Sequence, residues 1–166
     1  EYPGDYLQFI EMYTFAKART AGEIVSLLPK PVTLGDPYVN LWADMSRDDI
    51  SEYQIPPHFT NIQHAMQLAR RFLAAADTPN KQIILITDAR PTTYSDFDPS
   101  EDENWQYGWP RFRPGAVEET LKEVRRCTRS GITINTFMMA QEPSLVAFAR
   151  LMSQINKGRA FFATPG

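Results

Sequence analysis

Two side chains with oxygen donors occupy positions where they could bind a cation. In the stretch "KQIILITDARPTTY" the apolar run Ile83 to Ile86 stops at Thr87 and Asp88, and Thr60 precedes a helical pattern. A carboxylate in that place must be solvated, form a turn or bind a cation, because burying it alone costs several kcal/mol. A hard divalent cation such as Mg²⁺ prefers oxygen ligands and keeps several waters, so few protein ligands suffice. The alternatives, a turn-forming Asp88 and an N-capping Thr60, remain open at this point.

The chain that carries these residues alternates between helical and strand patterns. The stretch "FTNIQHAMQLARRFL" places Ile62, Met66, Ala69 and Leu73 at spacings of three and four, which is typical of an amphipathic helix. After the strand at Ile83 to Ile86, the patterns predict a helix in "AVEETLKEVRRCTRSG", a strand in "ITINTFMMA", a helix in "PSLVAFARLMSQI" and a strand in "GRAFFATP". Gly131 is predicted to end the first of these two helices and Pro143 to open the second.

This order predicts an α/β fold, a doubly wound and mostly parallel sheet with helices on both faces. The continuous apolar run Ile83 to Ile86 is typical of a parallel strand that is covered on both faces. Right-handed crossovers place every strand-to-helix loop at one edge, where ligands bind in such sheets. Asp88 lies at that edge.

Three further segments surround this pattern. Tyr6 to Ala18 is rich in aromatic residues and predicts one or two adjacent strands, whereas the proline-rich stretch Gly22 to Pro57 predicts short helices and loops. The segment "SDFDPSEDENWQYGWPRFRPG" is a polar and aromatic loop whose length suggests a function.

Composition limits the class of protein. The 166 residues are 43% hydrophobic and 22% charged, which fits one globular domain spanning residues 1–166. The net charge of −3 argues against a nucleic-acid partner, and the basic run Arg125 to Arg129 is interpreted as a solvated helix face. No apolar run approaches the length of about 20 residues that crosses a bilayer, so we expect a soluble domain without membrane insertion. The single cysteine, Cys127, is compatible with a reducing compartment and is expected to be buried rather than nucleophilic.

The residues around Asp88 and Thr60 resemble von Willebrand factor A (VWA) domains. "QIILITDARPTTY" resembles the fourth strand and following loop of that family, and "FTNIQHAMQLARRFL" resembles the loop and helix before it. From Phe59 to Pro165 the chain resembles a bacterial branch of cytoplasmic VWA proteins, many of which are associated with MoxR-type AAA+ ATPases. The resemblance implies a VWA/Rossmann-like fold, a cytoplasmic location, and a protein partner such as a MoxR-type ATPase.

The same resemblance implies a metal site. VWA domains carry a metal-ion-dependent adhesion site (MIDAS) built from an Asp-x-Ser-x-Ser run after the first strand, a threonine and a later aspartate. By resemblance, Thr60 would coordinate Mg²⁺ or Mn²⁺ directly and Asp88 through water. The Asp-x-Ser-x-Ser run is absent, since "DMSRDD" at Asp44 to Asp49 has the wrong spacing, and Ala89 stands where the family usually has glycine. A bound cation would therefore need ligands from outside this chain.

The first strand of the family is missing as well. The resemblance places that strand between the one matched by Tyr6 to Tyr13 and the one at Ile83 to Ile86. Without it, two strand edges lose their hydrogen-bond partners. We therefore expect that the domain is amino-terminally incomplete, that Glu1 is not the natural start, and that an upstream segment or another chain supplies the first strand and helix.

These features favour a non-catalytic protein–protein interaction module, not an enzyme, in which a divalent cation bridges the domain to a carboxylate on a partner. The aromatic residues Trp105, Tyr107 and Trp109 would then lie near the metal edge and contribute contact surface, although they could equally cover the sheet.

Two alternatives remain. Asp88 could be the phosphoacceptor or nucleophile of an α/β hydrolase, but no lysine follows the strand in "ITINTFMMA". His58 is the only candidate base, while His64, at helical spacing, is interpreted as structural. The second alternative is a metal-free VWA scaffold.

Overall fold

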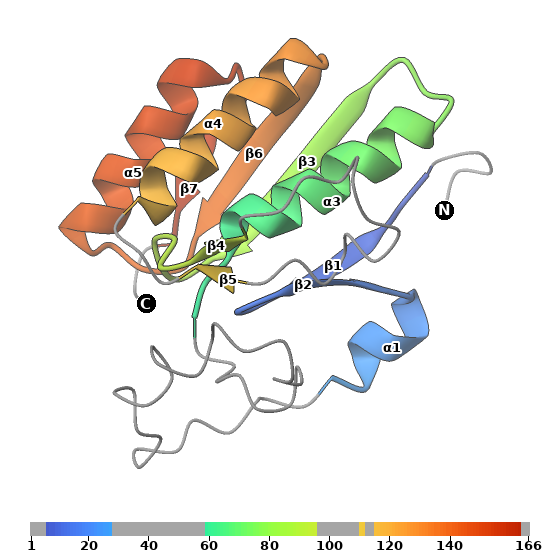
Figure 1. The fold of residues 1–166 in the computed structure, drawn as a ribbon, viewed down its shortest axis with the longest axis horizontal. Helices are drawn as coiled ribbons and strands as arrows, with labels where there is room; N and C mark the ends of the chain where they lie inside the picture. The colour runs from blue at the N-terminus through green and yellow to red at the C-terminus, as the bar shows by residue number, and fades with distance from the viewer. Residues whose placement is uncertain (1–5, 28–58, 96–109, 112–114, 164–166) are drawn as a thin grey trace.

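The computed structural model describes residues 6–27, 59–95, 110–111 and 115–163, drawn in colour in Figure 1. In chain order its elements are β1 (Phe9–Met12), β2 (Ala16–Arg19), α1 (Ala21–Val25), α3 (Ile62–Ala75), β3 (Lys81–Thr87), β4 (Tyr94–Ser95), β5 (Pro110–Arg111), α4 (Ala116–Arg129), β6 (Ile132–Met138), α5 (Pro143–Ile155) and β7 (Ala160–Phe162). Of these, β4 and β5 were not expected from the sequence.

A parallel sheet with the order β3-β6-β7 forms the centre of the fold. Ile83 lies opposite Ile134, and Phe137 lies opposite Phe161. The strands β1 and β2 form a separate antiparallel hairpin, and the two short strands β4 and β5 form another antiparallel pair. The predicted α/β fold with a parallel sheet is therefore confirmed, and the segment Tyr6 to Ala18 contains two strands.

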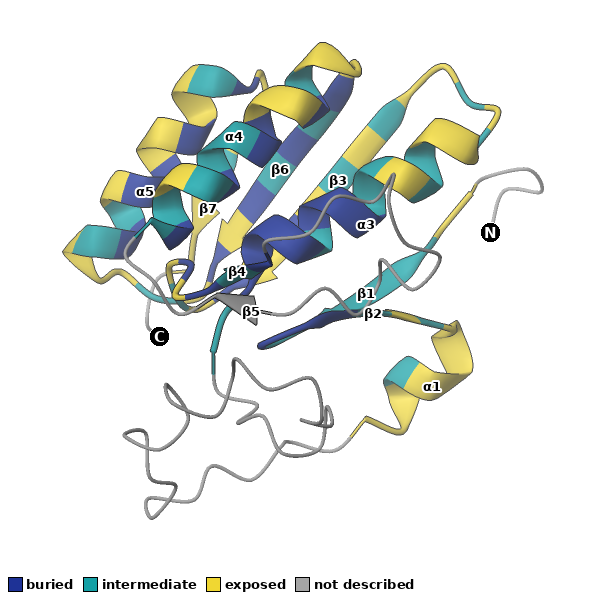
Figure 2. Ribbon diagram, viewed as in Figure 1, coloured by how far each residue is buried: buried dark blue, intermediate teal, exposed yellow. Residues whose placement is uncertain are grey.

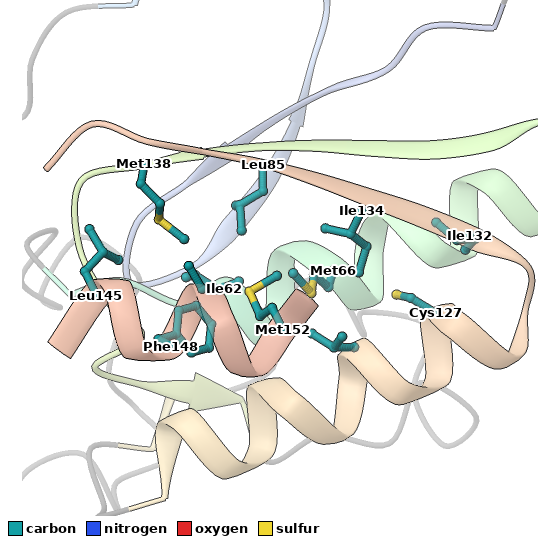
Figure 3. Close-up of a cluster of buried hydrophobic side chains, with 12 residues drawn as sticks. Ile62, Met66, Leu85, Cys127, Ile132, Ile134, Met138, Leu145, Phe148 and Met152 are labelled. Carbon is teal, nitrogen blue, oxygen red and sulfur yellow. The ribbon is translucent and has the colours of Figure 1, made fainter. Parts of the chain in front are cut away.

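The hydrophobic core lies between this sheet and the helices α3, α4 and α5, which pack side by side on one of its faces (Figure 1). Figure 3 shows Leu85 and Met138 projecting from the strands towards Phe148 of α5. The buried cluster consists of Ile62, Met66, Leu85, Val124, Cys127, Ile132, Ile134, Met138, Leu145, Phe148, Ala149 and Met152. Burial raises the pKa of the Cys127 thiol to about 12, so the expected packing role of this cysteine is confirmed.

The opposite face of the sheet carries exposed apolar side chains. Ile84 and Ile86 of β3 are 59% and 63% exposed, and they alternate with inward-facing residues, as the banding of β3 in Figure 2 shows. Phe137 and Phe161 stack on the same face with ring centroids 4.8 Å apart. The sequence pattern predicts cover on both faces, whereas the part of the chain that the structure describes places its long helices on one.

One edge of β3 also lacks a partner strand within the described part of the chain. The Met139 N–H donates to the Thr87 carbonyl at 2.9 Å, so the odd-numbered residues of β3 direct their backbone groups towards β6. The backbone groups of Gln82, Ile84 and Ile86 consequently face the other edge. No strand among the described residues pairs with that edge.

Local signals define the ends of the helices. The left-handed φ of 72° at Gly131 follows the last turn of α4, and Pro143 is the first residue of α5, as predicted. Glu123 of α4 is fully buried and bonds Arg70 of α3 at 2.6 Å and Arg126 at 2.8 Å. The run Arg125 to Arg129 was predicted to be a solvated helix face. Arg126 differs from that prediction, because it neutralises the buried carboxylate of Glu123.

Candidate functional site

The helix α3 begins one residue later than its sequence suggests. Its N-cap is Asn61, whose side-chain oxygen accepts from the His64 N–H at 3.0 Å. The capping role considered for Thr60 is therefore wrong, and the reason is that the buried amide side chain of Asn61 occupies the capping position. Thr60 lies outside the helix, so its hydroxyl is not used as a cap.

Asp88 follows β3 as an exposed residue. The turn after the strand is formed by its neighbour, because the Thr87 hydroxyl donates to the Ala89 carbonyl at 2.9 Å and accepts from the Ala89 N–H at 3.3 Å. Ala89 needs no positive φ, since no described residue other than glycine has one. Within the described ranges no hydrogen bond or ion pair engages the Asp88 carboxylate, which leaves it available to a ligand.

The structure joins the two loops that carry Thr60 and Asp88. The Thr60 N–H donates to the Thr92 hydroxyl at 2.9 Å, and the Thr60 carbonyl accepts from the N–H groups of Thr92 at 3.0 Å and Thr93 at 3.3 Å. These bonds attach the segment after Asp88 to the start of α3. The two predicted site residues therefore stand on connected loops at the carboxyl edge of the sheet, and their binding of a cation stays a prediction.

A buried polar network lies behind these loops. The Asn61 side-chain N–H₂ group donates to the Thr14 carbonyl and to the Ser95 hydroxyl, both at 3.0 Å. The side chain of Gln63 bonds the Ser95 backbone in both directions, at 3.1 Å and 2.9 Å. The turn of the β1–β2 hairpin, the first turn of α3 and the strand β4 are thereby fixed to one another. Sequence reasoning missed this network because isolated polar residues carry no periodic signal.

His64 has the structural role that the sequence suggests. The residue is 1% exposed, and its Nδ1 accepts from the Ala16 N–H at 3.2 Å. Its Nε2 is buried without a partner among the described residues. Burial lowers the pKa of His64 to about 4, because the positive charge would lose its hydration there.

This shift predicts a pH dependence of stability. The pKa in the folded state lies below the ordinary value of 6.5, so the unfolded chain binds the proton more readily between these two values. The contribution of neutral His64 to the free energy of unfolding is complete above pH 6.5 and is lost as the pH falls towards 4. At about pH 4.5 we expect a loss of about 2.5 kcal/mol in the free energy of unfolding.

Urea unfolding of the unsubstituted protein and of His64→Gln, at neutral and acidic pH, measures this loss. Glutamine can still accept a hydrogen bond but cannot be protonated, so His64→Gln should lose about 2.5 kcal/mol less on acidification. The carboxylates titrate in both proteins, and their effect cancels in the comparison. Parallel pH profiles for the two proteins would contradict the assignment.

The chemistry of the donors fits a hydrated hard cation. Thr60 and Asp88 offer a hydroxyl and a carboxylate, and Mg²⁺ typically binds through one or two carboxylates while it keeps several waters. The described residues contain no group of three or more His, Cys, Asp or Glu side chains that could hold a metal by themselves. His58, the segment Asp44 to Asp49, and the aromatic residues Trp105, Tyr107 and Trp109 lie outside the described residues.

Comparisons with known proteins indicate the family. A family model described as "Rv0959-like protein, vWA domain" matches residues 1–166. Among solved structures, the chain is similar to an aerotolerance-related membrane protein from Bacteroides fragilis NCTC 9343 with multiple mutations to serines. The identity is 16% and the TM-score 0.46, over 95% of this chain and 71% of that chain, and so weak a similarity carries no functional argument. No curated protein matches the sequence. Within the described residues, none of the helices has both the length and the apolarity to span a bilayer.

Proposed function

This chain belongs to the Rv0959-like family of VWA domains, and from that membership we propose that it is a non-catalytic protein-interaction module. We further propose that it recognises a carboxylate of its partner through Mg²⁺ or Mn²⁺ at the carboxyl edge of the sheet. The observation that carries the proposal is the connection of the Thr60 and Asp88 loops through Thr92.

The oxygen donors of Thr60 and Asp88 support the proposal that a cation binds at this edge. Thr60 does not cap α3, and within the described ranges no hydrogen bond or ion pair engages the Asp88 carboxylate, so both oxygen donors can serve a cation. When bound, the cation would act as a Lewis acid towards a partner carboxylate, because hydroxyl and water ligands leave its charge largely uncompensated. Asp88 supplies negative charge and Thr60 a neutral oxygen.

The rest of this metal site would come from a strand and a helix that complete the sheet. The open edge of β3 at Gln82, Ile84 and Ile86 supports an added strand, and the exposed face at Phe137 and Phe161 supports an added helix. Parallel sheets are normally covered on both faces, and an unpaired edge is a pairing site. We propose that this unit, from elsewhere in the polypeptide, carries the Asp-x-Ser-x-Ser ligands.

Two features support a binding role over a hydrolytic one. The one histidine among the described residues, His64, is buried and accepts a hydrogen bond from Ala16, so it cannot serve Asp88 as a base. The residues after β6, Met139 to Glu142, contain no lysine that could assist a phosphoacceptor. As the partner we propose a MoxR-type AAA+ ATPase, on the basis of the resemblance to the bacterial VWA branch, and as the compartment the cytoplasm.

Paramagnetic broadening by Mn²⁺ tests the location of the cation. Adding Mn²⁺ to the isotope-labelled full-length protein should broaden the amide signals of Thr60, Asp88 and Thr92, because the unpaired electrons relax nearby nuclei. The amide of Gly131, which precedes β6 at the opposite edge, is the internal control and should stay sharp. Excess Mg²⁺ should restore the broadened signals by competition. Broadening that avoids the Thr60 and Asp88 loops would contradict the proposed site.

A further inference from the structure

We infer that Thr92 is a positioning residue of the candidate cation site, which orients Thr60 and couples it to the loop of Asp88. The inference rests on the proposed function and adds a residue that neither the sequence pattern nor the family resemblance indicates. Its basis is the two-way hydrogen bonding between Thr60 and Thr92, in which each residue both donates and accepts.

The two bonds fix the backbone of Thr60 on both sides of its Cα atom. The N–H that donates to the Thr92 hydroxyl at 2.9 Å belongs to the peptide group before Thr60, and the carbonyl that accepts from the Thr92 N–H at 3.0 Å belongs to the peptide group after it. Since the two peptide planes determine φ and ψ, they also determine the direction of the Cα–Cβ bond. Thr92 therefore helps to set the direction in which the Thr60 side chain leaves the backbone.

The neighbouring residue is held in a different way. Asn61 is buried, its N–H donates to the Tyr13 carbonyl at 2.8 Å, and its side chain belongs to the polar network behind the loops. The Thr60 backbone, in contrast, is bonded to Thr92 and Thr93. Loss of the Thr92 hydroxyl should thus free the Thr60 N–H without releasing α3.

Thr92 is exposed, so its hydroxyl contributes little to the core. It lies four residues after Asp88, on the same short loop, and any shift of this loop is transmitted to Thr60 through the paired bonds. Small displacements of a ligand weaken binding, because the cation then meets its donors at non-ideal distances. One hydrogen bond of this kind corresponds to a change of up to roughly tenfold in affinity.

The test compares two variants of Thr92. Thr92→Val keeps the shape of the side chain but removes the hydroxyl that accepts from the Thr60 N–H, whereas Thr92→Ser keeps that hydroxyl. Thr133→Val is the matched control, because Thr133 lies on β6 near the opposite edge and no side-chain hydrogen bond is described for it. The measurements on the full-length protein are Mg²⁺ affinity by calorimetry, the urea midpoint, and hydrogen exchange of the Thr60 amide without metal. The exchange rate reports the Thr60–Thr92 bond independently of any cation.

We expect Thr92→Val to exchange the Thr60 amide about tenfold faster and to bind Mg²⁺ up to roughly tenfold more weakly, with an almost unchanged midpoint. Thr92→Ser should recover both properties, and Thr133→Val should alter neither. If Asp88→Ala loses Mg²⁺ affinity while Thr92→Val keeps it, the positioning role is overturned and the proposed function stands. If the unsubstituted protein does not bind Mg²⁺, both are overturned.

Discussion

Replacing Gly158 with alanine should lower the free energy of unfolding by about 3 kcal/mol or more, at the upper end of the usual cost of overpacking. Gly158 lies between α5 and β7, where a β-carbon would overlap the backbone carbonyl group of Ile134. Ile134 cannot retreat, because β6 is paired with β3 on one side and with β7 on the other. An alanine at position 158 would therefore either break the β6–β7 pairing or displace the segment that joins α5 to β7.

The hydrogen bonds around Gly158 increase the cost of such a movement. Asn156 is buried, and its side-chain oxygen accepts from the N–H groups of Ile134 at 2.8 Å and Gly158 at 2.9 Å. Its amide group donates to the Ile132 carbonyl and to the Thr128 hydroxyl, both at 2.9 Å. Displacing Gly158 would leave some of these buried polar groups unsatisfied, which adds to the steric penalty.

Urea unfolding of Gly158→Ala measures this effect, and Gly22→Ala is the matched control. A β-carbon at Gly22 meets no atom within 4 Å, and the residue lies inside the short helix α1. Alanine is favoured over glycine there by up to about 1 kcal/mol, so the control should be neutral or slightly stabilised. Equal unfolding midpoints for Gly158→Ala and the unsubstituted protein would contradict the packing described for this junction.

The fold could be predicted where local signals and periodicity agree. The stripe of α3, the stop at Gly131 and the start at Pro143 are properties of short segments, and each of them is found in the structure. The apolar run Ile83 to Ile86 could not reveal whether a helix covers its second face, since the same residues suit either case. The strands β4 and β5 depend on contacts with distant residues, such as Gln63 with Ser95.

The site was predicted less completely than the fold. Asp88 and Thr60 could be recognised because a strand ends before one and a helix begins after the other. Asn61 and Thr60 are both suitable N-cap residues, and bonds from Asn61 to the distant Thr14 and Ser95 decide between them. Thr92 could not be recognised, because an exposed threonine in a loop has no sequence signal until its partner is known.

The second large effect is expected from Asp88→Ala. Removal of the carboxylate takes away the negative charge that attracts the cation and the acceptor that would orient its water. Substitutions of groups that act on a metal in this indirect way typically reduce affinity by about 10- to 100-fold. Asp77→Ala is the control, because Asp77 is also exposed but lies before β3, at the opposite edge of the sheet. Asp77→Ala should leave the affinity for Mg²⁺ unchanged.

The central claim, a divalent cation held with the help of Asp88, is tested most directly by titrating Mg²⁺ into the full-length protein in a calorimeter. We predict saturable binding by the unsubstituted protein and by Asp77→Ala, and binding weakened about 10- to 100-fold in Asp88→Ala. Equal affinities for the unsubstituted protein and Asp88→Ala, or no binding by either, would contradict it.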